Sequence, residues 1–283
     1  MINLLDTHQH LVYRKEANYS WTKDIPPLAT EDFTIDSYLK LTEGLGVGGT
    51  LFMETGVDDP DYKKEAHFVK SLMENDSNGI KGLILSIRPE DNNSFDQWLE
   101  ETLSIGVSGF RRILHVMPDD TSQSETFRSN VKKIGKAGIP FDMCYLPTQL
   151  SIAFDLAKAC DDMHLVLNHC GVPSIATGEI DEWSKGIKSL SELPNVVCKL
   201  SGLMAYCAPG TSSLETIKPY VDHVLNCFGA DRIVWGSDWP VVNLGQGIQE
   251  WISVTRKILS NLSDNEAEAI ANANAQKIYK LSL

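Results

Sequence analysis

The first residues that could do chemistry lie in the run Leu4–His10, where two apolar residues lead into Asp6, His8 and His10. Successive side chains of a strand point to opposite faces, so a strand here places His8, His10 and Asp6 on one face. Two imidazoles about 7 Å apart along a strand can turn toward one ion or one substrate atom. Histidine is the commonest metal ligand and moves protons readily near neutral pH. The alternative is that the pair only decorates a strand end.

Polar residues also follow most of the other apolar runs of the chain. In a parallel barrel the carboxyl ends of all strands lie on one face, and that face carries the active site. Residues far apart in the sequence would therefore converge, which is the main argument for catalysis. These residues are Glu54, Arg88, Arg111, Arg112, Asp142, Asn168, His169, Lys199 and Asp238.

Individual members of this set have simpler interpretations. Arg111 and Arg112 are adjacent, so we expect one to face inward and the other to pair on the outside. Lys199 could extend from a helix–strand interface to solvent, and Asp142 could cap a turn. The remaining histidines lie away from the strand ends and are expected to be structural or at the surface. They are His67, His115, His164 and His223.

Eight apolar runs, centred near residues 5, 52, 85, 111, 141, 167, 198 and 235, predict the strands. Most are separated by about 25 to 40 residues, enough for a crossover helix between parallel strands. Helical patterns occupy several of the intervals, and two more, at about 248–260 and 264–281, follow the last strand. We therefore expect an α/β fold, a (β/α)8 TIM barrel that forms one domain over residues 1–283. An open doubly wound sheet would need a glycine-rich phosphate loop after its first strand, where this chain has His8 and His10.

Composition limits the classes of partner. A net charge of −13 disfavours nucleic acid and anionic membrane surfaces. No apolar run approaches the ~20 residues of a membrane span, and the chain enters its first strand without a signal peptide. The six cysteines show no CxxC spacing, which fits a reducing compartment. We expect a cytoplasmic enzyme with a small-molecule substrate, no nucleic acid partner and no membrane partner; a homo-oligomer stays open.

Several short motifs are distributed along nearly the whole chain. The motifs are Asp6-Thr7-His8-Gln9-His10, Gly109-Phe110-Arg111-Arg112, Leu167–Pro173, Cys198–Gly202 and Trp235–Pro240, with Asn274–Tyr279 near the C-terminus. Together they resemble the amidohydrolase superfamily, whose members are metal-dependent hydrolases built on a TIM barrel. The resemblance is strongest to the amidohydrolase-related branch that contains sugar-acid lactonases of the fuconolactonase and rhamnonolactonase types and the pyrone-dicarboxylate lactonase.

The resemblance implies roles for particular residues. His8, His10, His169 and Asp238 would form the reaction centre, with Asp238 as the general base that activates water and His169 as a second catalytic residue. Arg111 or Arg112 would hold a substrate carboxylate or polarise the carbonyl. Tyr145, just after the fifth strand, matches a position that hydrogen-bonds substrate. We further expect substrate contacts from Glu54, Trp21 and Lys199.

The resemblance also implies a metal. We expect at most one divalent ion, zinc by the nature of its ligands, held by His8, His10 and Asp238 with His169 or Glu54 completing the shell. The lysine that bridges two ions in binuclear members has no counterpart on the fourth strand, which carries Arg111 and Arg112. The fifth strand carries Asp142 in place of the usual ligand histidine. Metal-independent activity therefore stays open, since imidazoles and an arginine can also stabilise an oxyanion.

From these residues we expect a hydrolase that opens the lactone ring of a sugar acid or of a small carboxylated lactone by attack of water. One alternative is a metal-dependent amidohydrolase or decarboxylase on the same barrel. An alternative of another class is an inactive barrel that binds a ligand. Three imidazoles beside a candidate base argue against the last interpretation, because binding alone needs no base.

Overall fold

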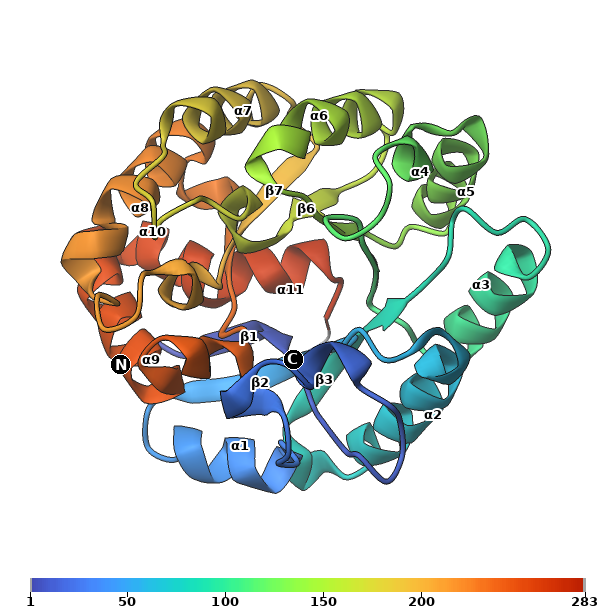
Figure 1. Ribbon diagram of the computed structural model, residues 1–283, viewed down its shortest axis with the longest axis horizontal. Helices are drawn as coiled ribbons and strands as arrows, with labels where there is room; N and C mark the ends of the chain where they lie inside the picture. Colours follow the sequence, from blue (N-terminus) through green and yellow to red (C-terminus); the bar gives the residue numbers. More distant parts are fainter. Residues whose placement is uncertain (1, 282–283) are drawn as a thin grey trace.

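The computed structural model describes residues 2–281, and it shows eight parallel strands that follow one another in sequence order around a barrel. Helices alternate with the strands and form an outer ring (Figure 1). The fold is therefore the predicted (β/α)8 TIM barrel. The strands are β1 (Leu4–Gln9), β2 (Val47–Met53), β3 (Ile80–Ser86), β4 (Gly109–Ile113), β5 (Phe141–Cys144), β6 (Leu165–Leu167), β7 (Val196–Leu200) and β8 (Ile233–Trp235).

All eight strands lie at the predicted places, because runs rich in Val, Ile, Leu and Phe are buried on both faces of a parallel sheet. Two strands end earlier than expected. The sequence pattern continues β6 to His169 and β8 to Asp238, but β6 ends at Leu167 and β8 at Trp235. Beyond those points the backbone takes conformations that no strand can hold, since both His169 and Asp238 have positive φ angles.

Helices cover the outside of the strands. Serine and threonine begin several of them by accepting a hydrogen bond from a backbone N–H of the first turn, as Thr34, Ser124 and Ser213 do. The helices are α1 (Ile35–Thr42), α2 (Tyr62–Met73), α3 (Phe95–Ser104), α4 (Asp120–Gln123), α5 (Glu125–Lys136), α6 (Leu150–Ala159), α7 (Asp181–Ser191), α8 (Leu214–Phe228), α9 (Gly247–Leu259), α10 (Asp264–Glu268) and α11 (Asn274–Ile278). Within residues 2–281, no helix is both long enough and apolar enough to cross a membrane.

The predicted final helix over 264–281 is interrupted. It begins with a capping box of Ser263 and Glu266, but a π-helical turn over Ala269–Ala273 separates α10 from α11. In Figure 1, α11 crosses the middle of the ring of helices. Its residues pack against the first inward-facing layer of the strands and close the amino end of the barrel. This layer consists of Leu5, Leu51, Met53, Ile84, Val166, Val197 and Val234, covered by Ala275, Ile278 and Tyr279.

Hydrogen bonds between β8 and β1 close the barrel. The His8 carbonyl accepts from the Asp238 N–H at 2.9 Å, and Thr7 Oγ1 donates to the Trp235 carbonyl at 2.7 Å. Asp6, expected on the face of His8, is used in this seam instead. Its carboxylate accepts from the Tyr38 hydroxyl at 2.6 Å and from the Ser237 N–H at 2.7 Å, so it does not join the histidines.

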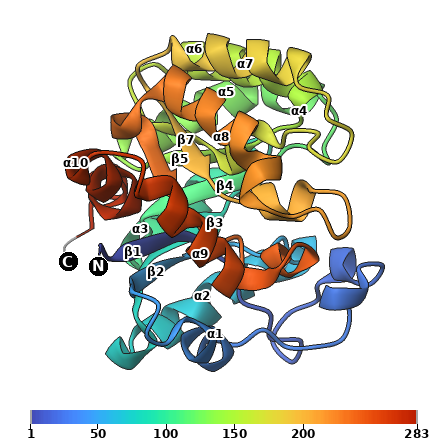
Figure 2. The same cartoon turned by 90° about the vertical axis from the view of Figure 1, so that its left-hand side faces the viewer.

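The two ends of the barrel differ in the segments that cover them. Figure 2 shows the N-terminal strand and the C-terminal helices meeting at one side of the molecule, and the long segment between β1 and α1 extending at the opposite side. That segment, residues 10–34, contains only two short 3-10 turns. It lies at the carboxyl end of β1, so it covers the end of the barrel where the polar residues gather.

Candidate active site

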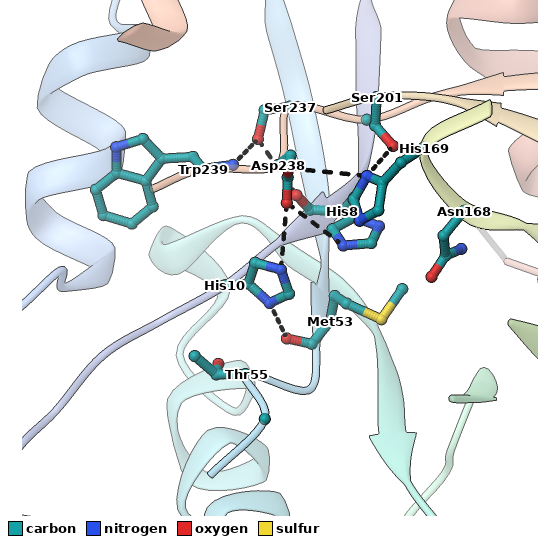
Figure 3. Close-up of polar contacts among 12 residues, drawn as sticks. His8, His10, Met53, Thr55, Asn168, His169, Ser201, Ser237, Asp238 and Trp239 are labelled. Carbon is teal, nitrogen blue, oxygen red and sulfur yellow. Dashed lines mark hydrogen bonds and ion pairs between the residues drawn. The ribbon is translucent and has the colours of Figure 1, made fainter. Parts of the chain in front are cut away.

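Asp238 lies among three imidazoles at the carboxyl end of the barrel. Its Oδ1 is 3.4 Å from His10 Nε2 and 3.7 Å from His8 Nε2, and its Oδ2 is 3.8 Å from His169 Nδ1 (Figure 3). These residues come from the ends of β1, β6 and β8, and Asp238 is only 2% exposed. The structure therefore brings together the four residues that the sequence predicted as a reaction centre.

Unusual backbone conformations aim two of these side chains. His169, Cys170 and Val172 have φ angles of 52°, 53° and 49°, and Asp238 has a φ of 59°. Non-glycine residues in this region cost roughly 1–3 kcal/mol each and persist where the surrounding structure fixes them. Such conformations cluster at functional sites, and here they turn His169 and Asp238 from the strand directions toward each other.

Two glycines allow the imidazoles to lie where they do. A Cβ atom on Gly202 would lie 2.7 Å from His169 Nδ1, and Gly202 also has a φ of 73°. A Cβ atom on Gly236 would lie 2.6 Å from His8 Cβ. Any side chain at either position would push a histidine out of the site, so both glycines are required by close approach.

Hydrogen bonds indicate which imidazole nitrogens carry a lone pair. His10 Nδ1 is 3.0 Å from the Met53 carbonyl, which only accepts, so Nδ1 donates and the Nε2 of the neutral ring presents a lone pair to Asp238. His8 Nε2 lies 3.2 Å from Arg111 Nη1, which only donates, so this nitrogen also presents a lone pair. Asp238 Oδ1 thus faces two nitrogen acceptors, an arrangement that favours a proton or a cation between them.

Burial keeps the imidazoles neutral. It lowers the pKa of His8 well below its usual value, and the neighbouring histidines, Lys199 and Arg111 add to the effect. Burial likewise lowers the pKa of His169 to about 3, although the Asp238 carboxylate opposes the shift. Both rings are therefore hydrogen-bonding or ligating groups at neutral pH rather than cations.

Of the two adjacent arginines, Arg111 faces the site. Its Nε donates to Glu54 Oε1 at 2.6 Å and its Nη2 to the Glu54 carbonyl at 2.6 Å. Burial alone would raise the pKa of Glu54, but the charges of Arg111 and Arg88 and the hydrogen bonds from Arg111 and Gly56 together outweigh it and leave this pKa below its usual value. Arg112 points away from the site and donates to Glu90 Oε1 at 2.9 Å. Of the two alternatives that the sequence left open, the structure therefore favours Arg111.

Glu54 and Lys199 are buried and engaged by other groups of the protein. The Glu54 carboxylate is taken up by Arg111 and by the Gly56 N–H at 2.9 Å, so it acts through the arginine. Lys199 is fully buried beneath the histidines, where its Nζ donates to Asp142 Oδ1 at 2.6 Å and to the Thr7 carbonyl at 2.9 Å. Both residues were expected to bind substrate; the structure gives them supporting positions instead.

Tyr145 also lies elsewhere than expected. Strand alternation directs Asp142 and Cys144 into the barrel and Tyr145 toward the helices, where its hydroxyl lies near Ser122. Burial raises the pKa of Tyr145. The predicted hydrogen bond from Tyr145 to substrate is therefore not supported. Trp21 is 37% exposed on the long segment after β1 and donates to the Thr55 carbonyl at 2.9 Å, so its contact with substrate stays a prediction.

Sequence reasoning missed three neighbours of the centre. Ser201 Oγ is 3.0 Å from His169 Nδ1, and the Tyr206 ring meets the His169 ring edge-on with a centroid distance of 6.1 Å. His115, expected to be structural or at the surface, places Nδ1 3.1 Å from Cys144 Sγ. Ser201 lies in the Cys198–Gly202 motif and could have been found there. Tyr206 ends a short 3-10 helix (Leu203–Tyr206) and His115 lies in a turn, where no periodic pattern shows the direction of a side chain.

The donor set fits one divalent cation. His8, His10 and Asp238 each offer a ligand atom, and these atoms lie within 4.8 Å of one another. A tetrahedral zinc site with ligands at 2.0–2.2 Å separates its donors by roughly 3.3–3.6 Å, close to the two carboxylate–imidazole distances. His169 is outside this trio, contrary to its predicted role as a ligand. One feature opposes a cation: Arg111 Nη1 lies 3.2 Å from the same His8 nitrogen that would bind it.

Residues 5–281 match a family model described as Amidohydrolase. Protein y4mH of Sinorhizobium fredii is 24% identical, with 99% of each chain covered. An L-fucono-1,5-lactonase of Burkholderia multivorans is 25% identical over 98% of this chain and 96% of its own. A crystal structure of a B. multivorans amidohydrolase with bound zinc superimposes with a TM-score of 0.88 at 24% identity, covering 99% of this chain and 100% of that one.

Proposed function

Because the chain belongs to the amidohydrolase family, we propose that it hydrolyses a lactone by attack of water on the ring carbonyl. The substrate class is the lactone of a sugar acid or a small carboxylated lactone. Full-length similarity to an L-fucono-1,5-lactonase supports the substrate class, and the zinc in a structural relative supports zinc as the ion of the His8–His10–Asp238 trio.

The observation that carries the proposal is the buried Asp238 carboxylate in contact with three imidazoles. In this proposal Asp238 accepts a proton from the attacking water while the water oxygen bonds to the carbonyl carbon. The ring C–O bond then breaks, and Asp238 returns the proton to the departing alkoxide oxygen. The product is a hydroxy acid, which releases a proton at neutral pH.

Arg111 supplies the positive charge for the oxygen that becomes negative during attack. Its guanidinium is buried and held from one side by Glu54, so it need not reorganise as charge develops. Groups fixed in this way are the largest contributors to many enzymatic rate enhancements. A divalent ion bound to His8, His10 and Asp238 would supply further polarisation of the carbonyl and would lower the pKa of a bound water.

Ser201 and Asp238 both contact the same nitrogen of His169, Nδ1. A serine nucleophile needs a histidine that receives its proton on one nitrogen and is oriented by a carboxylate on the other. That arrangement is absent here, so Ser201 holds the His169 ring, and His169 Nε2 is the atom left to contact substrate. The geometry favours water over a side-chain nucleophile.

A panel of sugar-acid and carboxylated lactones, followed by the fall in pH on ring opening, tests the proposal. We expect turnover of at least one member, with a loss on exhaustive chelation and a return on addition of zinc. Turnover that survives chelation would assign carbonyl polarisation to Arg111 alone. Release of CO2 from a hydroxybenzoate without lactone opening would favour a decarboxylase, and saturable binding without turnover would favour a ligand-binding barrel.

A further inference from the structure

An ion pair between Lys199 and Asp142 lies on the barrel axis directly beneath the histidines. Both side chains are fully buried, and Lys199 Nζ donates to Asp142 Oδ1 at 2.6 Å. The Asp142 carboxylate also accepts from Asn168 Nδ2 at 2.7 Å and from the Tyr279 hydroxyl at 2.9 Å. The pair therefore lies in a fixed network between the catalytic layer and the C-terminal helix α11.

The network holds the backbone beside two residues of the site. Lys199 Nζ donates to the carbonyl of Thr7 at 2.9 Å, and Thr7 precedes His8. Asn168, which donates to Asp142, precedes His169. His8 and His169 come from β1 and from the end of β6, two strands that β7 and β8 separate in the barrel, and their ring centroids are 4.4 Å apart. One ion pair thus joins the two chain segments that carry these rings.

Packing alone does not explain a charge in this place. The neighbouring side chains inside the barrel are apolar: Val234 is the ladder partner of Lys199, Val166 is that of Asp142, and both pack in one cluster with Leu5 and Val197. Moving two charges from water to such an interior carries a desolvation cost of several kcal/mol per ion, and well-packed apolar residues are often as stable or more stable. The charges are therefore better explained by what they hold in place.

We propose that Lys199 and Asp142 are positioning residues that fix His8 and His169 relative to each other, and that Tyr279 ties this pair to α11. The motif Asn274–Tyr279, which has no contact with the site, thereby acquires a role: it braces the network from the amino end of the barrel. The proposal rests on lactone hydrolysis for its kinetic readout only, because the placement of the two rings can be measured without activity.

The test is the double variant Lys199→Met with Asp142→Asn. It removes both charges together, so no unpaired ion is left in the interior; the new amide keeps an oxygen to accept from Asn168, and its NH2 can donate to the Tyr279 hydroxyl. We expect a folded protein whose kcat falls about 10- to 100-fold, the range found when supporting groups of a site are removed. KM should change less than about threefold, because substrate contacts themselves remain.

Arg232→Met is the matched control. Arg232 is a structural cation at the opposite end of the barrel, where it donates to the carbonyls of Ser191 at 2.8 Å and Leu193 at 3.0 Å, before the start of β7. It should lower thermal stability and leave kcat unchanged. If the double variant loses stability but keeps its kcat, as the control does, the pair is only structural and the proposal is overturned.

A second readout separates this proposal from the proposed function. The chain has seven histidines, few enough for the ring 15N signals to be assigned one by one. We expect the signals of His8 and His169 to move in the double variant and to stay in place in Arg232→Met. Unmoved signals overturn the proposal, and moved signals support it even if the wild type opens no lactone.

Tyr279→Phe provides the milder variant in case the double variant does not fold. It removes one hydrogen bond to Asp142 from α11 and leaves the ion pair intact. The same two histidine signals should move in the same direction, with a smaller loss of kcat. Signals identical to the wild type would exclude the brace from α11 and, without a folded double variant, would count against the whole network.

Discussion

Two polar layers inside the barrel differ in how their groups are paired. At the carboxyl end, Asp238 meets the imidazoles at 3.4–3.8 Å, longer than a good hydrogen bond. In the layer below, Lys199 and Asp142 meet at 2.6 Å, and both Asp142 oxygens have further donors. The Asp238 carboxylate of the upper layer can therefore still bind another atom, whereas the charged groups of the lower layer are already paired.

The difference shows how a buried charge can be either a reagent or a support. Complete pairing fixes a group in place, and it also takes the group out of chemistry. Incomplete pairing keeps Asp238 available to accept a proton or to bind a cation. Substitutions that treat the two layers alike should therefore have different consequences, and the same change at Asp238 and at Asp142 makes the sharpest contrast.

Asp238→Asn should cost activity and little stability. The amide cannot accept a proton from water, and loss of a general base typically lowers turnover by ~10²–10⁴-fold. The long contacts around Asp238 contribute little to folding, so the midpoint of urea unfolding should stay near that of the wild type. A variant with near-normal kcat would assign the base to another residue, with His169 next in line.

Asp142→Asn should lower the free energy of unfolding much more than Asp238→Asn does. It leaves the Lys199 ammonium buried without its counter-charge, and breaking one partner of a buried pair costs about 3–5 kcal/mol. Urea unfolding of the two Asp→Asn variants side by side measures the contrast. Equal stability of the two variants would remove the distinction between a loosely paired and a fully paired layer.

Arg111→Met should increase metal affinity while lowering lactone turnover. The guanidinium donates to the His8 nitrogen that a cation would need, so its removal relieves a repulsion and frees Glu54 as well. We expect zinc to bind about tenfold more tightly, measured by competition with a chromophoric chelator, which corresponds to ~1.4 kcal/mol. Arg112→Met, on the outer side of β4, is the control and should leave the zinc affinity as it is.

Glu65 on α2 is another buried acid, bonded to the Thr55 N–H at 3.1 Å rather than to a cation. Burial, together with the nearby Glu54 charge, raises its pKa from 4.5 to about 8. The folded protein therefore holds this proton more tightly than the unfolded chain does. Its contribution to stability is complete below the unfolded pKa and is lost as pH rises toward about 8, by about 1.4 kcal/mol per pH unit at most.

Glu65→Gln tests this contribution, because glutamine imitates the protonated acid at every pH. Between pH 5 and pH 8 the wild type should lose stability relative to the variant, with little difference between them near pH 4. Parallel stability curves for the two proteins over this range would show that Glu65 is ionised in the fold.

Much of the fold could be predicted from the sequence, since eight buried strands leave eight continuous apolar runs. The converging residues His8, His10, His169 and Asp238 could also be predicted, because parallel strands bring their carboxyl ends together. The residues at which β6 and β8 end could not be predicted. The left-handed conformations of His169 and Asp238 depend on close packing against Gly202 and the β1–β8 seam, which no local pattern reveals.

The side of the strand toward which each side chain points is the second feature that could not be predicted from the sequence. Lys199 and Tyr145 have suitable chemistry and follow or lie near strand ends, yet one faces the barrel axis below the site and the other faces the helices. A one-residue difference in strand register changes the face, and the sequence does not show where each strand stands relative to the layer of the histidines. The choice between Arg111 and Arg112 depended on the same register.

A single turnover in H2(18)O directly tests the proposal that Asp238 activates water for attack on a lactone carbonyl. With enzyme in excess over a lactone that it opens, the product is analysed by mass spectrometry after one turnover. If Asp238 is a general base, we expect one 18O atom in the product carboxylate and none in the Asp238 side chain. Product without 18O, with the label in Asp238, would show that Asp238 attacks the carbonyl as a nucleophile and would exclude its role as a general base.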